Sequence, residues 1–253
     1  MYIKNLAQLR KQDMKIAGGK AVFLGEMIKA KFLVPEGFVI LASAFKLCKN
    51  SYEIEDDVTD EILANFDNLN SHEVVVRSSA TVEDSVNDSW AGIFESYLRI
   101  NRGDLLSTIK KCWQSSLSSK ALAYAKQRHI DTDNINMAVI VQELIRPSLS
   151  GVCFTVNPIN KNHDQLMIEV CHGGPEDLVS GKITPDNFVV NKKTKEIEEQ
   201  NLFAKTGITK KQIDNLVNSC IEVENFFTHS CDIEWCIDGS NLFVLQSRPI
   251  TTL

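Results

Sequence analysis

The sequence predicts an α+β protein whose sheets are mixed or antiparallel. Strand-like and helix-like stretches are intermixed along the chain, and several of the strand-like stretches form hairpin-like pairs. The clearest helix covers residues 209–227, where apolar residues recur at helical spacing: Ile213, Leu216, Val217, Cys220, Val223 and Phe227. These three observations favour sheets combined with helices over an all-helical or all-strand fold.

The first half of the chain is predicted to begin with a short helix or edge strand. Gly18, Gly19 and Lys20 then open a helix to about residue 30, and Ser43 is expected to cap another short helix. The other predicted features are a turn at 34–37, strands at 38–41, 73–77 and 94–100, a solvated acidic run at 53–60, a polar loop at 78–81, a turn at 89–92, and helices at 105–113 and 120–129.

The second half is predicted to contain most of the strands. They lie at 137–142, 151–155, 165–170 and 186–190, with a helical turn at 176–180 and a charged surface turn at 191–200. The polar segment 131–136 is the best candidate for a boundary, which predicts an N-terminal lobe of residues 1–136 and a C-terminal lobe of residues 137–253.

Charge and cysteine content narrow the function classes. The 253 residues carry a formal net charge of −6, so no basic excess is present to neutralise nucleic acid or a membrane surface. The seven cysteines are scattered without a C-x-x-C pair, which is typical of reduced thiols. The N-terminus lacks an apolar run of secretory length, and no stretch is long enough to span a bilayer. We expect a cytoplasmic protein.

Residues 231–250 predict a β-hairpin that turns near Gly239. A two-residue loop would place Glu234 opposite Leu245. A three-residue loop instead places Glu234 opposite Gln246 and Asp232 opposite Arg248, and it also pairs Trp235 with Leu245 and Ile237 with Phe243. Because a one-residue slip turns every side chain to the other face, the three-residue loop is the preferred prediction.

That register gathers two carboxylates, an amide oxygen and a guanidinium on one face of the hairpin. Hard oxygen ligands beside a fixed cation suit a Mg²⁺ ion on the phosphates of a nucleotide, with the arginine on a phosphate oxygen. The alternative is an exposed polar face with a weak Asp–Arg pair across the strands.

Two further segments are candidates for phosphate binding. Gly18, Gly19 and Lys20 precede a helix, where backbone N–H groups and a lysine can meet an anion. Arg77 ends a strand and is followed by hydroxyl-bearing residues, which together can form an anion cradle. The alternatives are an ordinary helix start for the first segment, and an arginine paired with Glu83 or Asp84 for the second.

Taken in order, these segments resemble a known family. The matching motifs are G-G-K-A-V-F-L-G-E-M at 18–27, V-P-E-G-F-V at 34–39, V-R-S-S-A-T-V-E-D at 76–84, W-A-G-I-F-E-S-Y-L at 90–98, V-Q-E-L-I at 141–145, S-G-V-C-F-T-V-N-P at 150–158, G-K-I-T-P-D at 181–186, and D-I-E-W with L-Q-S-R-P at 232–249. They resemble the nucleotide-binding domain that pyruvate phosphate dikinase shares with phosphoenolpyruvate synthase and rifampicin phosphotransferase.

The resemblance implies an ATP-grasp fold in which two lobes hold ATP. It assigns Lys20 and Arg77 to the phosphates, Gly92 and Ser96 to a turn approaching the phosphates, and Gln142 to the neighbourhood of the adenine. It assigns Ser150 and Glu176 to further nucleotide contacts, Glu234 and Gln246 to Mg²⁺, and Asp232 and Arg248 to catalytic positions beside the transferring group.

The sequence also departs from the family. Relatives carry a swivelling phosphohistidine domain and an acceptor domain, whereas this chain ends at Leu253. None of its five histidines lies in the family's phosphohistidine motif, although His172 adjoins a Gly-Gly loop on the expected nucleotide side. The segment between Leu98 and Met137 also looks short for the family.

We therefore predict an ATP- and Mg²⁺-dependent phosphotransferase half. It would pass a phosphoryl group to a histidine on a separate protein, which would then phosphorylate a small-molecule acceptor. Such transfer needs positioning and charge neutralisation more than covalent chemistry. The alternatives are a self-sufficient small-molecule kinase or ATP-grasp ligase, and a non-catalytic nucleotide-binding module.

Overall fold

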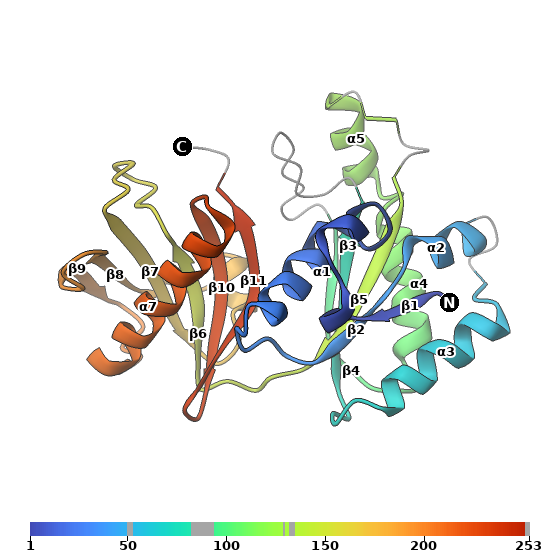
Figure 1. Cartoon of the computed structure of the whole chain (residues 1–253), viewed down its shortest axis with the longest axis horizontal. Coiled ribbons are helices and arrows are strands. Elements are labelled where there is room, and N and C mark those ends of the chain that lie inside the picture. Colours follow the sequence, from blue (N-terminus) through green and yellow to red (C-terminus); the bar gives the residue numbers. More distant parts are fainter. Residues whose placement is uncertain (50–52, 82–93, 129, 132–134, 251–253) are drawn as a thin grey trace. The chain divides into compact units, whose positions relative to one another are not determined.

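The chain forms two compact units in the computed structural model, which describes residues 1–49, 53–81, 94–128, 130–131 and 135–250 (Figure 1). The first unit comprises Met1–Lys29 and Pro35–Leu144, and the second comprises Ala30–Val34 and Ile145–Leu253. The short segment 30–34 belongs to the second unit, where the carbonyl of Leu33 accepts a hydrogen bond from Val244 N at 2.9 Å.

The first unit contains a five-stranded antiparallel sheet in the order β1-β2-β5-β3-β4. Its strands are β1 (Ile3–Asn5), β2 (Gly37–Ile40), β3 (Val74–Ala80), β4 (Ser96–Ile100) and β5 (Met137–Glu143). Because β5 is the middle strand of this sheet, the division between the units falls after it. The boundary predicted before residue 137 is therefore wrong.

Helices cover both faces of this sheet. They are α1 (Met14–Lys29), α2 (Ala42–Cys48), α3 (Asp56–Asp67), α4 (Leu105–Ser115) and α5 (Ser119–Gln127), with short 3₁₀ turns at Leu6–Gln8 and Lys11–Asp13. The main core forms where α2, α3 and α4 meet alternate residues of the strands, including Val74, Val76, Val139 and Val141. Strand residues of the other parity, such as Arg77, Ser79 and Gln142, therefore point to the opposite face, against which α1 packs.

The second unit contains a six-stranded antiparallel sheet in the order β11-β10-β6-β7-β8-β9. Its strands are β6 (Leu149–Phe154), β7 (Gln165–His172), β8 (Asp186–Asn191), β9 (Ile197–Leu202), β10 (Cys231–Asp238) and β11 (Asn241–Pro249). Its helices are α6 (Glu176–Val179) and α7 (Lys210–Phe227).

Helix α7 lies across one face of this sheet and buries the apolar stripe that the sequence predicted (Figure 1). A Thr209 cap begins the helix, because its hydroxyl accepts from Gln212 N. The sheet face that α7 covers carries Trp235, whose ring lies over Gly151. A Cβ atom on Gly151 would come within 2.9 Å of the Trp235 ring and 1.8 Å of the Glu169 carbonyl, so only glycine fits there.

Three local predictions are wrong in whole or in part. Ser43 lies inside α2, which begins after Leu41. The predicted polar loop at 78–81 is mostly strand, because β3 continues to Ala80 and pairs with β5. The predicted surface turn at 191–200 is correct only at its start, because β9, an exposed edge strand, begins at Ile197 and runs to Leu202. In the second and third segments, a run of mostly polar residues concealed the strand.

The described part of the chain has no helix with the length and apolar character needed to cross a bilayer. All seven cysteines are buried free thiols.

Candidate functional site

The C-terminal hairpin has the register that brings its polar residues together. Glu234 pairs with Gln246 and Asp232 pairs with Arg248, as predicted. The turn, however, is a two-residue loop, because Asp238 pairs directly with Asn241. The predicted pairs Trp235–Leu245 and Ile237–Phe243 are therefore wrong.

A β-bulge at Leu245 reconciles the short loop with the predicted polar pairs. Trp235 pairs with Val244 while Glu234 pairs with Gln246, so Leu245 is an extra residue in β11. The extra residue lets Val244 face the buried side with Trp235 while Gln246 faces the other side with Glu234. The bulge thus directs the amide of Gln246, which is only 6% exposed, toward the polar face.

Asp232 and Arg248 form a partly buried ion pair. Both Nε and Nη2 of Arg248 donate to Oδ2 of Asp232, at 2.8 and 2.7 Å. The other carboxylate oxygen, Oδ1, is buried without a hydrogen-bond partner in the described part of the chain. Burial raises the pKa of Asp232, Arg248 opposes this shift, and the negative charge of Glu234 adds to it.

Strand pairing extends this polar row across the sheet to a residue that the sequence pattern did not predict. Glu234 pairs with Val152 of β6, and Val152 pairs with Glu169 of β7, so all three face the same side. Burial raises the pKa of Glu169, and the negative charge of Asp232 raises it further. Only the pairing order of the strands could have revealed this third carboxylate, since β7 itself reads as an apolar strand.

Ser150 and Glu176 lie on the same side of the second sheet. Ser150 pairs with Cys236 on one side and Cys171 on the other, and its Oγ lies 3.4 Å from Cys171 Sγ. Glu176 begins α6 and its carboxylate folds over Gly174, while its charge contributes to the raised pKa of Cys236. The structure therefore brings every site residue predicted in the second unit to one sheet face.

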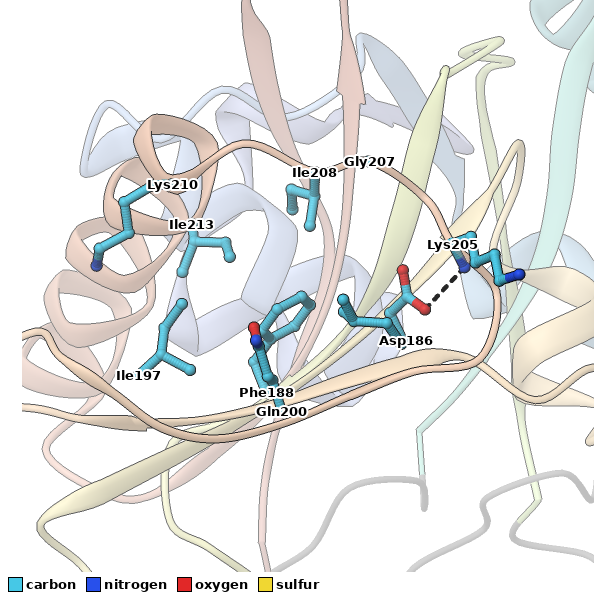
Figure 2. Close-up of a pocket in the computed structure, with 10 residues that line it drawn as sticks. Asp186, Phe188, Ile197, Gln200, Lys205, Gly207, Ile208, Lys210 and Ile213 are labelled. Atoms are coloured by element: carbon cyan, nitrogen blue, oxygen red, sulfur yellow. Dashed lines mark hydrogen bonds between the residues drawn. The ribbon is translucent and has the colours of Figure 1, made fainter.

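A cavity in the second unit lies elsewhere. It has a volume of about 430 Å³ and is lined by β8, β9, the loop before α7 and the first turns of α7, including Phe188, Leu202 and Ile213 (Figure 2). Phe188 pairs with Ile168, which belongs to the face covered by α7. None of the predicted site residues lines this cavity.

In the first unit, Arg77, Ser96 and Gln142 share the sheet face that packs on α1. Arg77 pairs with Ser96 of β4 and with Ile140 of β5, and Gln142 lies two residues from Ile140. The Gln142 side chain is buried, and its Nε2 donates to the carbonyl of Pro35 at 2.9 Å. Its amide therefore ties β5 to the turn that precedes β2, a role that the sequence did not predict.

Lys20 follows a kink in α1 at Gly18, whose φ of 77° and ψ of 165° are not helical. Gly18 divides α1 into a short helical segment that begins at Met14 and a longer one that runs to Lys29, so a helix does begin after Gly18, as predicted. Of two other positions considered in the sequence, only one lies among the described residues. Gly92 lies outside the described residues, and His172 is an exposed residue at the end of β7.

Comparison with known protein families identifies the family of this chain. Residues 48–207 and 203–253 match the family described as the pyruvate phosphate dikinase, AMP/ATP-binding domain. The chain belongs to this family. The resemblance seen in the motifs is thereby confirmed.

Curated relatives of this dikinase-family chain are much longer proteins. A probable phosphoenolpyruvate synthase of Methanocaldococcus jannaschii is 30% identical over the whole chain, which covers 27% of that relative. The rifampicin phosphotransferase of Bacillus cereus is 29% identical, again over the whole chain and 36% of the relative. The chain thus spans about a quarter to a third of these two relatives' lengths.

A solved structure supports the fold. Cdc123 of Schizosaccharomyces pombe matches 95% of this chain and 86% of its own, with a TM-score of 0.51 and 13% identity. The dikinase-family chain has the α+β ATP-grasp fold that its sequence predicted, built here from two antiparallel sheets.

Proposed function

We propose that this chain binds ATP with Mg²⁺ and passes a phosphoryl group to a histidine on a separate domain or protein. The histidine would then phosphorylate a small-molecule acceptor, and the reducing cytoplasm is the proposed location. The relatives' names, phosphoenolpyruvate synthase and rifampicin phosphotransferase, support phosphoryl transfer in this family.

The hairpin register is the observation that carries the proposal. The pairs Glu234–Gln246 and Asp232–Arg248 lie side by side on one sheet face. A purely structural hairpin has no need to gather two carboxylates, a buried amide and a guanidinium on the face away from α7. These groups can bind a nucleoside triphosphate and its cation.

The donor set fits Mg²⁺. Magnesium prefers oxygen ligands, and it is usually held by one or two protein groups together with substrate phosphates. Glu234 supplies a carboxylate and Gln246 supplies a buried amide oxygen from the neighbouring strand. When bound, the cation would neutralise charge on the phosphate oxygens.

The basic residues have separate proposed roles. Asp232 accepts two hydrogen bonds from the Arg248 guanidinium through its Oδ2. This ion pair restricts the rotamers of Arg248, so its guanidinium would be pre-oriented toward a phosphate. In the first unit, Lys20 and Arg77 would bind phosphate oxygens of the same nucleotide. Ser96 would contribute beside Arg77, with which it pairs across the strands. Gly92, Gln142, Ser150 and Glu176 remain proposed nucleotide contacts.

The protein groups in this proposal bind and orient, and the accepting histidine supplies the nucleophile. The phosphoryl group leaves the nucleotide oxygen and forms a bond with the imidazole nitrogen. Cationic side chains stabilise the charge that develops during this in-line transfer.

The test is a product assay with Mg²⁺ and ATP, with and without a phosphohistidine-domain protein from a relative. We expect little turnover by the chain alone. With the histidine protein, ADP would be released if only the terminal phosphoryl group is transferred. AMP and phosphate would be released if the dikinase pattern is kept, in which the terminal diphosphate passes to the imidazole, AMP leaves, and water then removes the outer phosphate. Glu234→Ala should reduce transfer by at least about 100-fold, because it removes a direct metal ligand. The matched control is Glu199→Ala, which removes an exposed carboxylate from the edge strand β9 of the same sheet.

The outcomes separate the alternatives. ADP formed with a small acceptor and no second protein would support a self-sufficient kinase. ATP binding without turnover under any pairing would support a binding module. Full activity of Glu234→Ala would refute the metal assignment.

A further inference from the structure

We infer that Ser79 is a positioning residue that fixes the Gly18–Lys20 segment of α1 against strand β3, and so sets where Lys20 meets the nucleotide. This inference rests on the proposed function, because it assigns a role to Ser79 within the proposed phosphate-binding group.

The Ser79 hydroxyl bonds to two backbone groups of α1. Its Oγ donates to the carbonyl of Ala17 at 2.7 Å and accepts from the backbone N–H of Ala21 at 3.2 Å. The side chain is completely buried, so these bonds do not compete with solvent. Residues 17 and 21 are the pair that would bond directly to each other in a continuous α-helix.

The Ser79 hydroxyl therefore replaces one backbone hydrogen bond of α1. Side chains that insert into the i to i−4 ladder are a recognised cause of sharp helix kinks. The inserted hydroxyl satisfies both backbone groups that the kink separates, so the opened turn leaves neither of them unpaired. Lys20 lies inside this opened turn, between the two bonded residues.

Gly18 makes the insertion possible. A Cβ atom at this position would lie 2.3 Å from the Ser79 carbonyl oxygen and 2.4 Å from Ser79 Oγ. Its φ of 77° is also in the left-handed region, which side chains other than glycine adopt only with strain. The glycine thus allows both the backbone conformation and the close approach of β3.

Strand β3 connects this clamp to the second proposed phosphate ligand. Ser79 and Arg77 are two residues apart in β3, so their side chains share the face toward α1. One hydroxyl therefore links the backbone that carries Lys20 to the strand that carries Arg77. Ser78, between them, points into the opposite face, where its Oγ is buried without a hydrogen-bond partner in the described part of the chain.

Ser79 and Ser78 form a matched pair for an experiment. Ser79→Ala removes the clamp and allows the turn to close into a regular helix, which would reorient Lys20. Ser78→Ala removes a neighbouring buried hydroxyl that bonds to neither end of the turn. We would measure binding of a non-hydrolysable ATP analogue with Mg²⁺ by calorimetry, and folding by circular dichroism and thermal unfolding.

We expect Ser79→Ala to weaken analogue binding by about tenfold, a change on the scale of lost hydrogen bonds, while Ser78→Ala binds like the wild type. On the Lys20→Ala background, Ser79→Ala should have little further effect, because its action passes through Lys20. A merely structural role would lower the melting temperature without this dependence on Lys20.

Two results would overturn the inference: wild-type affinity in a folded Ser79→Ala variant, or effects of Ser79→Ala and Lys20→Ala that simply multiply. If Ser79→Ala does not fold, Ser79→Thr, which keeps the hydroxyl, replaces it: wild-type binding agrees with the clamp, and weakened binding in a folded protein contradicts it. Failure of the wild-type chain to bind the analogue would instead count against the proposed function.

Discussion

Asp232 illustrates how a single side chain on the polar sheet face is constrained. Its Oδ2 receives both hydrogen bonds from Arg248, while Oδ1 is buried without a partner in the described residues. Buried polar atoms without hydrogen-bond partners are exceptions in folded proteins, and groups with strongly perturbed pKa values cluster at functional sites. The neighbouring negative charges of Glu234 and Glu169 are likewise unfavourable unless a cation offsets them. The local electrostatics thus favour a cation on this face.

A substitution at Glu169 tests for a cation on this sheet face without measuring activity. We expect Glu169→Gln to weaken binding of Mn²⁺, used as a spectroscopic substitute for Mg²⁺, to the complex with a non-hydrolysable ATP analogue. The expected factor is about tenfold, typical of residues that stand behind direct metal ligands. The physical reason is the loss of a negative charge in the row of Glu234.

The measurement is a titration of Mn²⁺ followed by electron paramagnetic resonance. Glu199→Gln is the control, since it removes an exposed carboxylate from the edge of the same sheet. An unchanged Mn²⁺ affinity in Glu169→Gln would show that this carboxylate does not influence the cation.

At the scale of elements, the hairpin shows both the reach and the limit of prediction from sequence. Alternation of polar and apolar residues correctly predicted the pairs Glu234–Gln246 and Asp232–Arg248. It could not predict that a two-residue loop and a bulge at Leu245 together produce them, because a bulge interrupts the alternation on which the prediction depends. Similarly, β9 escaped prediction because an exposed edge strand has few apolar residues.

The remaining part of the site was hidden for a different reason. Glu169 and Ser79 act through residues that are distant in sequence, such as Glu234 on another strand and Ala17 on a helix. Their roles depend on strand order and on side-chain contacts, which local patterns do not contain. The motifs that resemble the family indicated candidate phosphate and metal residues, but not the residues that we propose hold them in place.

The connection between β8 and α7 makes a prediction about acid stability. Asp186 is buried at the start of β8 and accepts hydrogen bonds from Lys205 N, Thr206 N and Thr206 Oγ1, at 2.9, 2.7 and 2.6 Å (Figure 2 shows the first of these). Burial by itself raises the pKa of Asp186, but these hydrogen bonds lower it more, so the pKa is below its ordinary value. The ionised carboxylate therefore stabilises the folded chain.

Because this pKa is depressed in the folded state, the stabilisation is present above the ordinary aspartate pKa of about 3.9 and is lost as the pH falls through the folded value. We expect Asp186→Asn to lower the free energy of unfolding by about 2–3 kcal/mol at pH 7, and by less at pH 3. Urea unfolding at the two pH values measures this difference. Asp164→Asn, at an exposed position, should have little effect, and an equal loss for Asp186→Asn at both pH values would contradict the prediction.

At the scale of the whole molecule, the chain consists of two units that each have their own sheet. The sequence predicted two lobes but placed the boundary at a polar segment, although strand β5 beyond that segment pairs with β2 and β3 of the first unit. Composition marks surface segments, whereas the division between units depends on which strands pair. The predicted site residues are distributed over both units, with Lys20 and Arg77 in the first and Glu234 and Gln246 in the second.

This distribution leads to a prediction about thermal unfolding. If residues of both units bind one nucleotide, the Mg²⁺–ATP complex should stabilise the chain by mass action, by about 2.7 kcal/mol at a concentration 100 times its dissociation constant. For a chain of this length, that corresponds to a rise in melting temperature of about 5–10 °C. Lys20→Ala and Glu234→Ala should each remove most of this rise at the same ligand concentration, although they belong to different units.

If each unit bound its own ligand, each variant would keep the part of the rise that arises from the unmodified unit. Scanning calorimetry of the wild type, both single variants and the Glu199→Ala control distinguishes the two cases, and a full rise in Lys20→Ala would show that the first unit does not share the nucleotide.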